Sequence, residues 1–331
     1  MIKNIVLLAF TALASAEIAA RVSSLDALML KPLLYYQDSD LEVQEPSPNP
    51  ERLYQLKPGA TTHTLEFQKP VSINSLGFRD MARSAAKAPE TTRIICLGGS
   101  TTYGAAVGDD ETFPHYLEQA LNREYKGKFE VWTAGLCAYV LSSETAYARE
   151  IIEKFDPDVL IFQYANIGRR AFTPDAPYAS YFRRNPELYR ENLRFIPFPR
   201  SAAALWLLRH CAAYRSAVVL ANCFMFVEDN NPRYNNETAN LAMFSSFCNE
   251  NKNRLKIFIM PSKDWHDAPN DEFKNMLSTT EAQKLDIFSP NLLPKNASSE
   301  YFLIHPPAHV YKWYAQAMAK EMERHGAVVK K

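Results

Sequence analysis

The chain has 331 residues, with 37 Lys+Arg against 37 Asp+Glu, so its formal net charge is +0 at pH 7. Hydrophobic residues make up 47% and charged residues 22%, which is typical of a packed globular protein and too apolar for a disordered one. The chain lacks the basic excess of nucleic-acid-binding proteins, and a nucleic-acid partner is therefore excluded from the predictions.

The amino terminus predicts export. Lys3 precedes an apolar run over residues 5–14, and Ala14-Ser15-Ala16 has the small residues of a signal-peptide cleavage site. Glu17 interrupts the run before it is long enough for a bilayer core of about 30 Å. Residues 1–16 are interpreted as a signal peptide, or alternatively as a short anchor that associates with the membrane. The protein is then periplasmic, extracellular or attached to the outer face of the cytoplasmic membrane.

Residues 17–90 are interpreted as a loop-rich arm, because prolines and polar residues interrupt every long element. The alternating pattern of residues 64–68 predicts one of its short strands. The five cysteines of the chain are an odd number without C-x-x-C spacing, so no metal or redox motif is indicated. A disulfide bond between two of the residues Cys211, Cys223 and Cys248 is possible, but the sequence does not indicate which two would form it.

Residues 91–331 predict one α/β domain. Apolar runs predict strands at 93–97, 129–133, 158–164, 255–260 and, shorter, at 285–288. Amphipathic patterns predict helices at 112–125, 142–155 and 305–324. This alternation is typical of a mostly parallel five-stranded sheet with helices on both faces. Residues 168–254 break the alternation and are interpreted as a helical insertion.

In parallel sheets the chemistry lies at the carboxyl ends of the strands, which directs attention to the segment after residue 97. Gly98, Gly99, Ser100 and Gly104 lie there. The spacing lacks the G-x-G-x-x-G pattern and the lysine of phosphate-binding loops. The alternative is a serine nucleophile on a strand-to-helix turn, where glycines let a substrate approach the backbone.

Four segments in order resemble the blocks of the SGNH/GDSL hydrolases, and with an upstream segment the resemblance spans residues 71–320. Residues 98–114 are similar to the first block and residues 133–135 to the second. Residues 164–166 resemble the third block, and residues 305–315 the last one. Upstream, residues 74–79 (Asn-Ser-Leu-Gly-Phe-Arg) resemble a segment of exported bacterial members. The resemblance implies a flavodoxin-like three-layer α/β/α sandwich.

The resemblance also implies site residues. Ser100 is expected as the nucleophile and His305 as the general base and acid, because a serine hydroxyl needs a base to attack an ester. Ser100, Gly135 and Asn166 are expected to form the oxyanion hole. The candidate substrate-binding residues are Arg169, Arg170, Tyr103 and Asp264.

The last block departs from the family pattern. Phe302 stands three residues before His305, where the family has the aspartate that orients the histidine. The remaining alternatives are a backbone carbonyl, a substitute carboxylate, or a site that has lost its activity. The substitute carboxylates considered are Glu300, Asp264, Asp267 and Asp286.

The third block is altered as well, because Tyr164 replaces its glycine and Ile167 its aspartate. His309 lies one helical turn after His305, but H-x-x-x-H without the intervening glutamate is a weak zinc signal. We therefore predict no metal and no cofactor. The expected function is hydrolysis or transfer of an acyl group, typically acetyl, on a cell-envelope carbohydrate or small ester. The alternative is a catalytically inactive protein that binds carbohydrate or serves in polysaccharide assembly.

Overall fold

The computed structural model describes residues 2–23, 43–49, 51–52, 54–64, 67–137, 139–164, 201–223, 237–261, 278, 282–289, 291–292 and 305–331. The chain divides into two compact units, and each is considered by itself. The helical unit comprises Met1–Leu41 and Phe172–Asn235, and the sheet unit comprises Glu42–Ala171 and Asn236–Lys331.

The sheet unit contains a five-stranded parallel sheet. Its strands are β5 (Thr91–Gly98), β6 (Lys128–Gly135), β7 (Val159–Tyr164), β8 (Lys256–Pro261) and β9 (Gln283–Lys284). Their spatial order is β6-β5-β7-β8-β9. In chain order this is 2-1-3-4-5, the order of the flavodoxin-like doubly wound fold. The predicted sheet is therefore confirmed.

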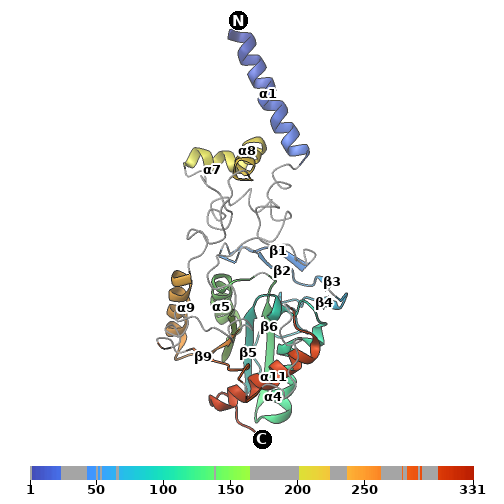
Figure 1. Ribbon diagram of the computed structural model, residues 1–331, viewed down its shortest axis with the longest axis vertical. Helices are drawn as coiled ribbons and strands as arrows, with labels where there is room; N and C mark the ends of the chain where they lie inside the picture. The colour runs from blue at the N-terminus through green and yellow to red at the C-terminus, as the bar shows by residue number, and fades with distance from the viewer. Residues whose placement is uncertain are drawn as a thin grey trace. The chain divides into compact units, whose positions relative to one another are not determined.

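Helices cover both faces of this sheet, which gives the three layers expected (Figure 1). On one face α4 (Phe113–Glu124) and α11 (Ala308–Arg324) pack in one core cluster with Ile94, Val131 and Phe258. On the other face lie α5 (Leu141–Phe155) and α9 (Glu237–Asn251). There Phe162 of β7 contacts two α9 rings, with centroid separations of 4.9 Å to Phe244 and 5.7 Å to Phe247.

The fifth strand differs from its prediction. Residues 285–288 were expected to form it, whereas β9 is Gln283–Lys284. The Leu285 N–H still donates to the Ile259 carbonyl over 2.8 Å, but Ile287 N–H then turns back onto the Leu285 carbonyl. Leu285, Ile287 and Phe288 are buried in the cluster that contains α11, so their apolar pattern reflects packing rather than an extended backbone.

The arm forms two antiparallel hairpins. β1 (Gln44–Pro46) pairs with β2 (Tyr54–Leu56), and β3 (Thr61–His63) pairs with β4 (Pro70–Ser72). Residues 65 and 66 of the strand expected at 64–68 lie outside the described residues. The described residues of this segment are not in a strand: Gln68 N–H donates to the Thr64 carbonyl over 3.0 Å, and Gln68 has a φ of 51°.

The helical unit contains α1 (Ile2–Val22), α7 (Ala202–His210) and α8 (Ala212–Cys223). By length and composition, the Lys3–Val22 part of α1 is the one helix among the described residues that is apolar and long enough to cross a membrane. Glu17 lies inside α1 and does not end it. Cys211 and Cys248 carry free thiols, so the bridge between them is not formed.

Candidate active site

Ser100 begins a short helical turn directly after the central strand β5. This turn, α3 (Ser100–Tyr103), is closed by backbone hydrogen bonds from Tyr103 N–H to the Gly99 carbonyl and from Gly104 N–H to the Ser100 carbonyl, both 2.9 Å long. Gly104 has a φ of 88°, a left-handed conformation that favours glycine. The turn leaves Ser100 half-buried at the carboxyl end of the sheet.

The end of β6 packs directly against this turn. Gly98 and Gly135 are opposite each other in the parallel register of β5 and β6. A Cβ atom on Gly135 would lie 2.2 Å from the Tyr103 backbone nitrogen, so only glycine allows the contact. The structure thus brings Ser100 and Gly135 to the same edge of the sheet.

Gln163 of β7 holds the turn from the other side. Its Oε1 atom accepts hydrogen bonds from the Thr102 N–H (3.1 Å) and the Thr102 hydroxyl (2.9 Å). The Gln163 side chain is 7% exposed. The sequence reasoning missed this residue, although an amide inside the apolar run of β7 is a signal for a polar contact at the strand end.

Arg79 holds the end of α3. Its guanidinium donates to the carbonyl oxygens of Tyr103 (2.9 Å), Gly104 (2.7 Å) and Val107 (2.6 Å) and to the Asp109 carboxylate (3.0 Å). The guanidinium also lies over the Tyr103 ring, 4.7 Å from its centroid. Arg79 is fully buried, so these acceptors replace the water that its charge loses.

The segment before Arg79 explains why the arm carries the Asn-Ser-Leu-Gly-Phe-Arg block. Asn74 Oδ1 accepts from the N–H groups of Leu76 and Phe78, both at 3.0 Å, and Gly77 has a φ of 83°. The Phe78 ring is fully buried against Trp132 of β6, with centroids 5.1 Å apart. This turn and its anchor direct Arg79 towards α3.

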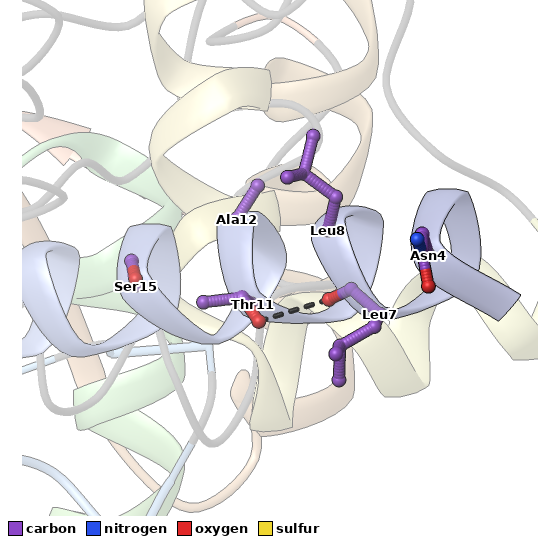
Figure 2. A pocket seen from close by; sticks show the side chains of 6 residues that line it. All are labelled: Asn4, Leu7, Leu8, Thr11, Ala12 and Ser15. Atoms are coloured by element: carbon purple, nitrogen blue, oxygen red, sulfur yellow. Dashed lines mark hydrogen bonds between the residues drawn. The ribbon is translucent and has the colours of Figure 1, made fainter. Parts of the chain in front are cut away.

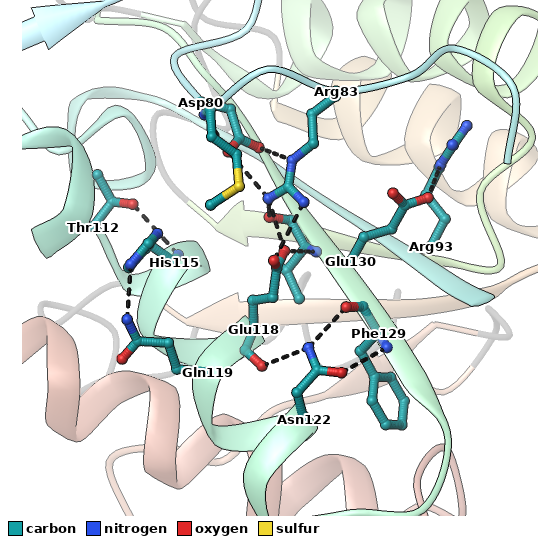
Figure 3. A network of polar contacts seen from close by, with 12 residues as sticks. Asp80, Arg83, Arg93, Thr112, His115, Glu118, Gln119, Asn122, Phe129 and Glu130 are labelled. Atoms are coloured by element: carbon teal, nitrogen blue, oxygen red, sulfur yellow. Dashed lines mark hydrogen bonds and ion pairs between the residues drawn. The ribbon is translucent and has the colours of Figure 1, made fainter. Parts of the chain in front are cut away.

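A buried acidic and basic network follows Arg79 (Figure 3). Arg83 donates to Asp80 (3.1 Å) and to Glu118 of α4 (2.7 Å), and Glu118 accepts from the Val131 N–H of β6 (2.6 Å). Burial raises the pKa of the Asp80 carboxyl to about 6, although the positive charge of Arg83 opposes this rise. The network joins the arm to α4 and β6 behind the site.

His305 lies three residues before the first residue of α11, which begins at Ala308 and not at residue 305 as expected. It is half-buried and is followed by Pro306 and by Pro307, the N-cap of the helix, so the prolines mark the helix start as predicted. One turn further on, Tyr311 packs near Phe113, with ring centroids 6.2 Å apart. Phe113 begins the helix that follows the Ser100 turn. The pairing of Ser100 with His305 stays a prediction.

Other predicted site residues lie outside the described part of the chain. They are Asn166, Arg169, Arg170, Asp264, Asp267, Glu300 and Phe302. Asp286 is described, and its carboxylate pairs with Lys284 at 3.4 Å. Tyr103, a candidate substrate-binding residue, is fully buried with the Arg79 guanidinium over its ring, and its contact with substrate stays a prediction. His309 is exposed, and no group of three or more metal-binding side chains occurs within the described ranges.

No protein-family model matches the chain, and no curated protein matches it. Solved structures do. Psychrotrophic esterase EstA from Pseudoalteromonas sp. has 9% identity and a TM-score of 0.40, over 71% of this chain and 99% of that one. A variant of Axe2, an acetyl xylan esterase from Geobacillus stearothermophilus, has 14% identity and a TM-score of 0.40, over 72% and 97%. AlinE4, an SGNH-hydrolase family esterase, has 13% identity and a TM-score of 0.34, over 72% and 98%.

These TM-scores are below 0.5, so the assignment of the fold rests on the chain's own sheet. The strand order is that of the flavodoxin-like fold, and the first two sequence blocks end neighbouring strands at its carboxyl edge. This is the strand order that the resemblance of the sequence blocks led us to expect.

Proposed function

We propose that the protein is a serine-dependent acyl-ester hydrolase or O-acyltransferase of the cell envelope. The observation that supports this proposal most directly is the position of Ser100. It begins a tight turn at the end of the central strand, and that turn packs against Gly135 at the end of the neighbouring strand. A nucleophile and a backbone donor of an oxyanion hole need this proximity.

In the proposed mechanism the Ser100 hydroxyl attacks the ester carbonyl while His305 takes its proton. The negative charge on the tetrahedral oxygen is stabilised by the N–H groups of Ser100 and Gly135 and by the Asn166 amide. His305 then gives the proton to the leaving alcohol, which leaves an acyl group on Ser100. Water completes hydrolysis, and a second alcohol completes acyl transfer.

The group that orients His305 is the main departure from the family pattern. Phe302 occupies the usual aspartate position in the sequence. A backbone carbonyl, Glu300, Asp264 or Asp267 takes this role in the proposal, whereas Asp286 is already paired with Lys284. Loss of an orienting carboxylate costs about 10⁴ in turnover in a serine protease, so a carbonyl would support a slower enzyme.

The proposed substrate is an O-acetylated carbohydrate or a small ester outside the cytoplasm. This choice follows the resemblance of residues 74–79 to exported members of the family and the apolar helix at the amino terminus. Arg169 and Arg170 follow Asn166 by a few residues and are proposed to contact an anionic group of the substrate.

Release of p-nitrophenol from p-nitrophenyl acetate by the purified full chain tests the proposal. Ser100→Ala and His305→Gln are each expected to lower the rate by about 10³ or more. His309→Gln is the matched control, because this exposed histidine lies one turn further on. Hydrolysis that survives Ser100→Ala would reject Ser100 as the nucleophile. If the folded wild-type protein hydrolysed none of a range of acyl esters, the enzyme proposal would be rejected in favour of the binding-protein alternative.

A further inference from the structure

We infer that α1 is retained in the folded protein as a membrane anchor, and that it holds helices α7 and α8 at the lipid surface. The large apolar side chains of α1 are exposed, and their exposed fractions run from 59% for Ile5 to 83% for Val22. The Lys3–Val22 helix is apolar enough to enter a membrane, and very little of it is buried against the rest of the protein. The part of α1 before Glu17, residues 2–16, is about 22 Å long and so is shorter than a bilayer core of about 30 Å; it enters the membrane as a short anchor, with Glu17 and Arg21 at the lipid surface.

The Thr11 hydroxyl in the middle of α1 is compatible with lipid. Figure 2 shows one face of the helix, formed by Asn4, Leu7, Leu8, Thr11, Ala12 and Ser15. The Thr11 hydroxyl donates to the Leu7 carbonyl one turn earlier, over 2.9 Å. A hydroxyl that is satisfied within its own helix avoids the cost of an unpaired polar group in hydrocarbon.

The two charged residues near the end of α1 bind the junction of α7 and α8. The Glu17 carboxylate accepts hydrogen bonds from the N–H groups of Ala212 (3.0 Å) and Ala213 (2.9 Å), which begin α8. Arg21 donates to Glu17 over 2.6 Å and to the carbonyl of His210, the last residue of α7, over 2.7 Å. Glu17 thus caps one helix and Arg21 the other, each with the charge that its helix end favours.

These contacts distinguish an anchor from a signal peptide. Glu17 and Arg21 reach partners about 190 residues later in the chain, so the end of α1 is an integral part of the helical unit. The predicted cleavage site at Ala16 lies inside α1, one residue before the cap. Cleavage there would leave the cap on a six-residue stub. A retained helix keeps it in place.

The α7–α8 pair has the side chains of an interfacial segment. Trp206 of α7 is 57% exposed and Leu220 of α8 is 45% exposed, and Arg209 and His210 form the last turn of α7. Tryptophan prefers the headgroup region, and basic side chains favour anionic lipids. Arg215 of α8 is buried, and its guanidinium donates to the Leu208 carbonyl over 2.6 Å. This hydrogen bond offsets part of the cost of burying the arginine charge among apolar side chains.

Two measurements on the full chain test this inference, and both are independent of the proposed catalysis. Membranes from expressing cells are washed with alkaline carbonate, and the intact mass of the extracted protein is measured. We expect the protein in the membrane pellet with residues 1–16 present. A soluble protein whose mass begins at Glu17 would overturn the inference.

The second measurement uses vesicles of phosphatidylcholine and phosphatidylglycerol with bromine near the headgroups. We expect the quenchable part of the tryptophan emission to be lost in Trp206→Phe and kept in Trp313→Phe, the control in the sheet unit. The double variant Glu17→Ala/Arg21→Ala is expected to stay in the membrane but to lose most of the quenching. Equal quenching in the wild type and in Trp206→Phe would exclude α7 from the lipid surface, and unchanged quenching in the double variant would refute the Glu17–Arg21 link.

Discussion

The guanidinium of Arg79 donates to the carbonyl oxygen of Gly104 over 2.7 Å, at the point where the helical turn of Ser100 ends. The last carbonyls of a helix lack partners within the helix, and a buried arginine satisfies them here. The arm thus contributes directly to the placement of the candidate nucleophile, although it lies outside the sheet. This relationship makes Arg79 a positioning residue of the proposed site.

We therefore expect Arg79→Lys to lower kcat on p-nitrophenyl acetate by about 10- to 100-fold with a smaller change in KM, because a lysine cannot reproduce the planar fork of donors. Steady-state kinetics and thermal unfolding check this. Arg83→Lys is the matched control on the same segment, since Arg83 binds Asp80 and Glu118 rather than the Ser100 turn. It should lower stability but not kcat, and equal losses of kcat in both variants would contradict the positioning role.

A second prediction concerns Gly135, whose lack of a side chain allows α3 to pack on β6. Its added Cβ would meet backbone atoms of residues 102 and 103, which cannot rotate away. Gly135→Ala is expected to destabilise the fold by about 1 to 3 kcal/mol, the usual cost of overpacking, and to displace Ser100. Urea unfolding measures the loss.

Gly108→Ala is the control for Gly135→Ala, because its Cβ would meet the movable end of the Glu111 side chain at 3.3 Å. It should change stability and esterase activity little. If Gly135→Ala were as stable and active as the wild type, the close packing of the two strand ends would be wrong.

The sheet could be predicted from the sequence because its strands are buried on both faces and are separated by amphipathic helices. Chain order, short connections and glycines at the ends of two strands then placed Ser100 and Gly135 at one edge. Contacts between distant segments were not predictable. Nothing local marks Arg79 as the partner of Gly104, or Glu17 as the cap of α8, since each contact joins segments that only the fold brings together.

The errors have the same origin. The alternating pattern at residues 64–68 resembles a strand, but Gln68 and Thr64 at its two ends are joined by a local hydrogen bond and are not in a strand. The apolar residues after β9 have the pattern of a strand because their side chains are buried in the core, although their backbone is not extended. The spacing of apolar residues along the sequence indicates which side chains are buried. It does not show whether the backbone of a short buried segment is extended or turned.

A third prediction concerns Gln163, the amide that binds Thr102. Gln163→Leu would leave the buried Thr102 N–H and hydroxyl without their acceptor, at a cost of about 1 to 3 kcal/mol. Thr102→Val removes only the hydroxyl bond and should cost less. Unfolding free energies of both single variants and the double variant check this. Additive losses would show that the two side chains do not interact.

The last prediction concerns the pH dependence of stability. The pKa of the Asp80 carboxyl is raised from 3.8 to about 6, chiefly by burial. Between these two values the folded protein binds more protons at Asp80 than the unfolded chain does, so the free energy of unfolding falls as the pH rises. The contribution is fully present below about pH 4 and is lost as the pH passes 6, and it amounts to about 3 kcal/mol.

Asp80→Asn is expected to remove this dependence, because the amide stays neutral and keeps an oxygen that accepts from Arg83. Urea unfolding between pH 4 and 8 should show a shallower decline for Asp80→Asn than for the wild type. Asp110→Asn, which alters an exposed carboxylate, is the control and should leave the decline unchanged. If Asp80→Asn and the wild type declined in parallel, Asp80 would be ionised throughout this range, and the balance of burial against the charge of Arg83 would favour the ion pair instead.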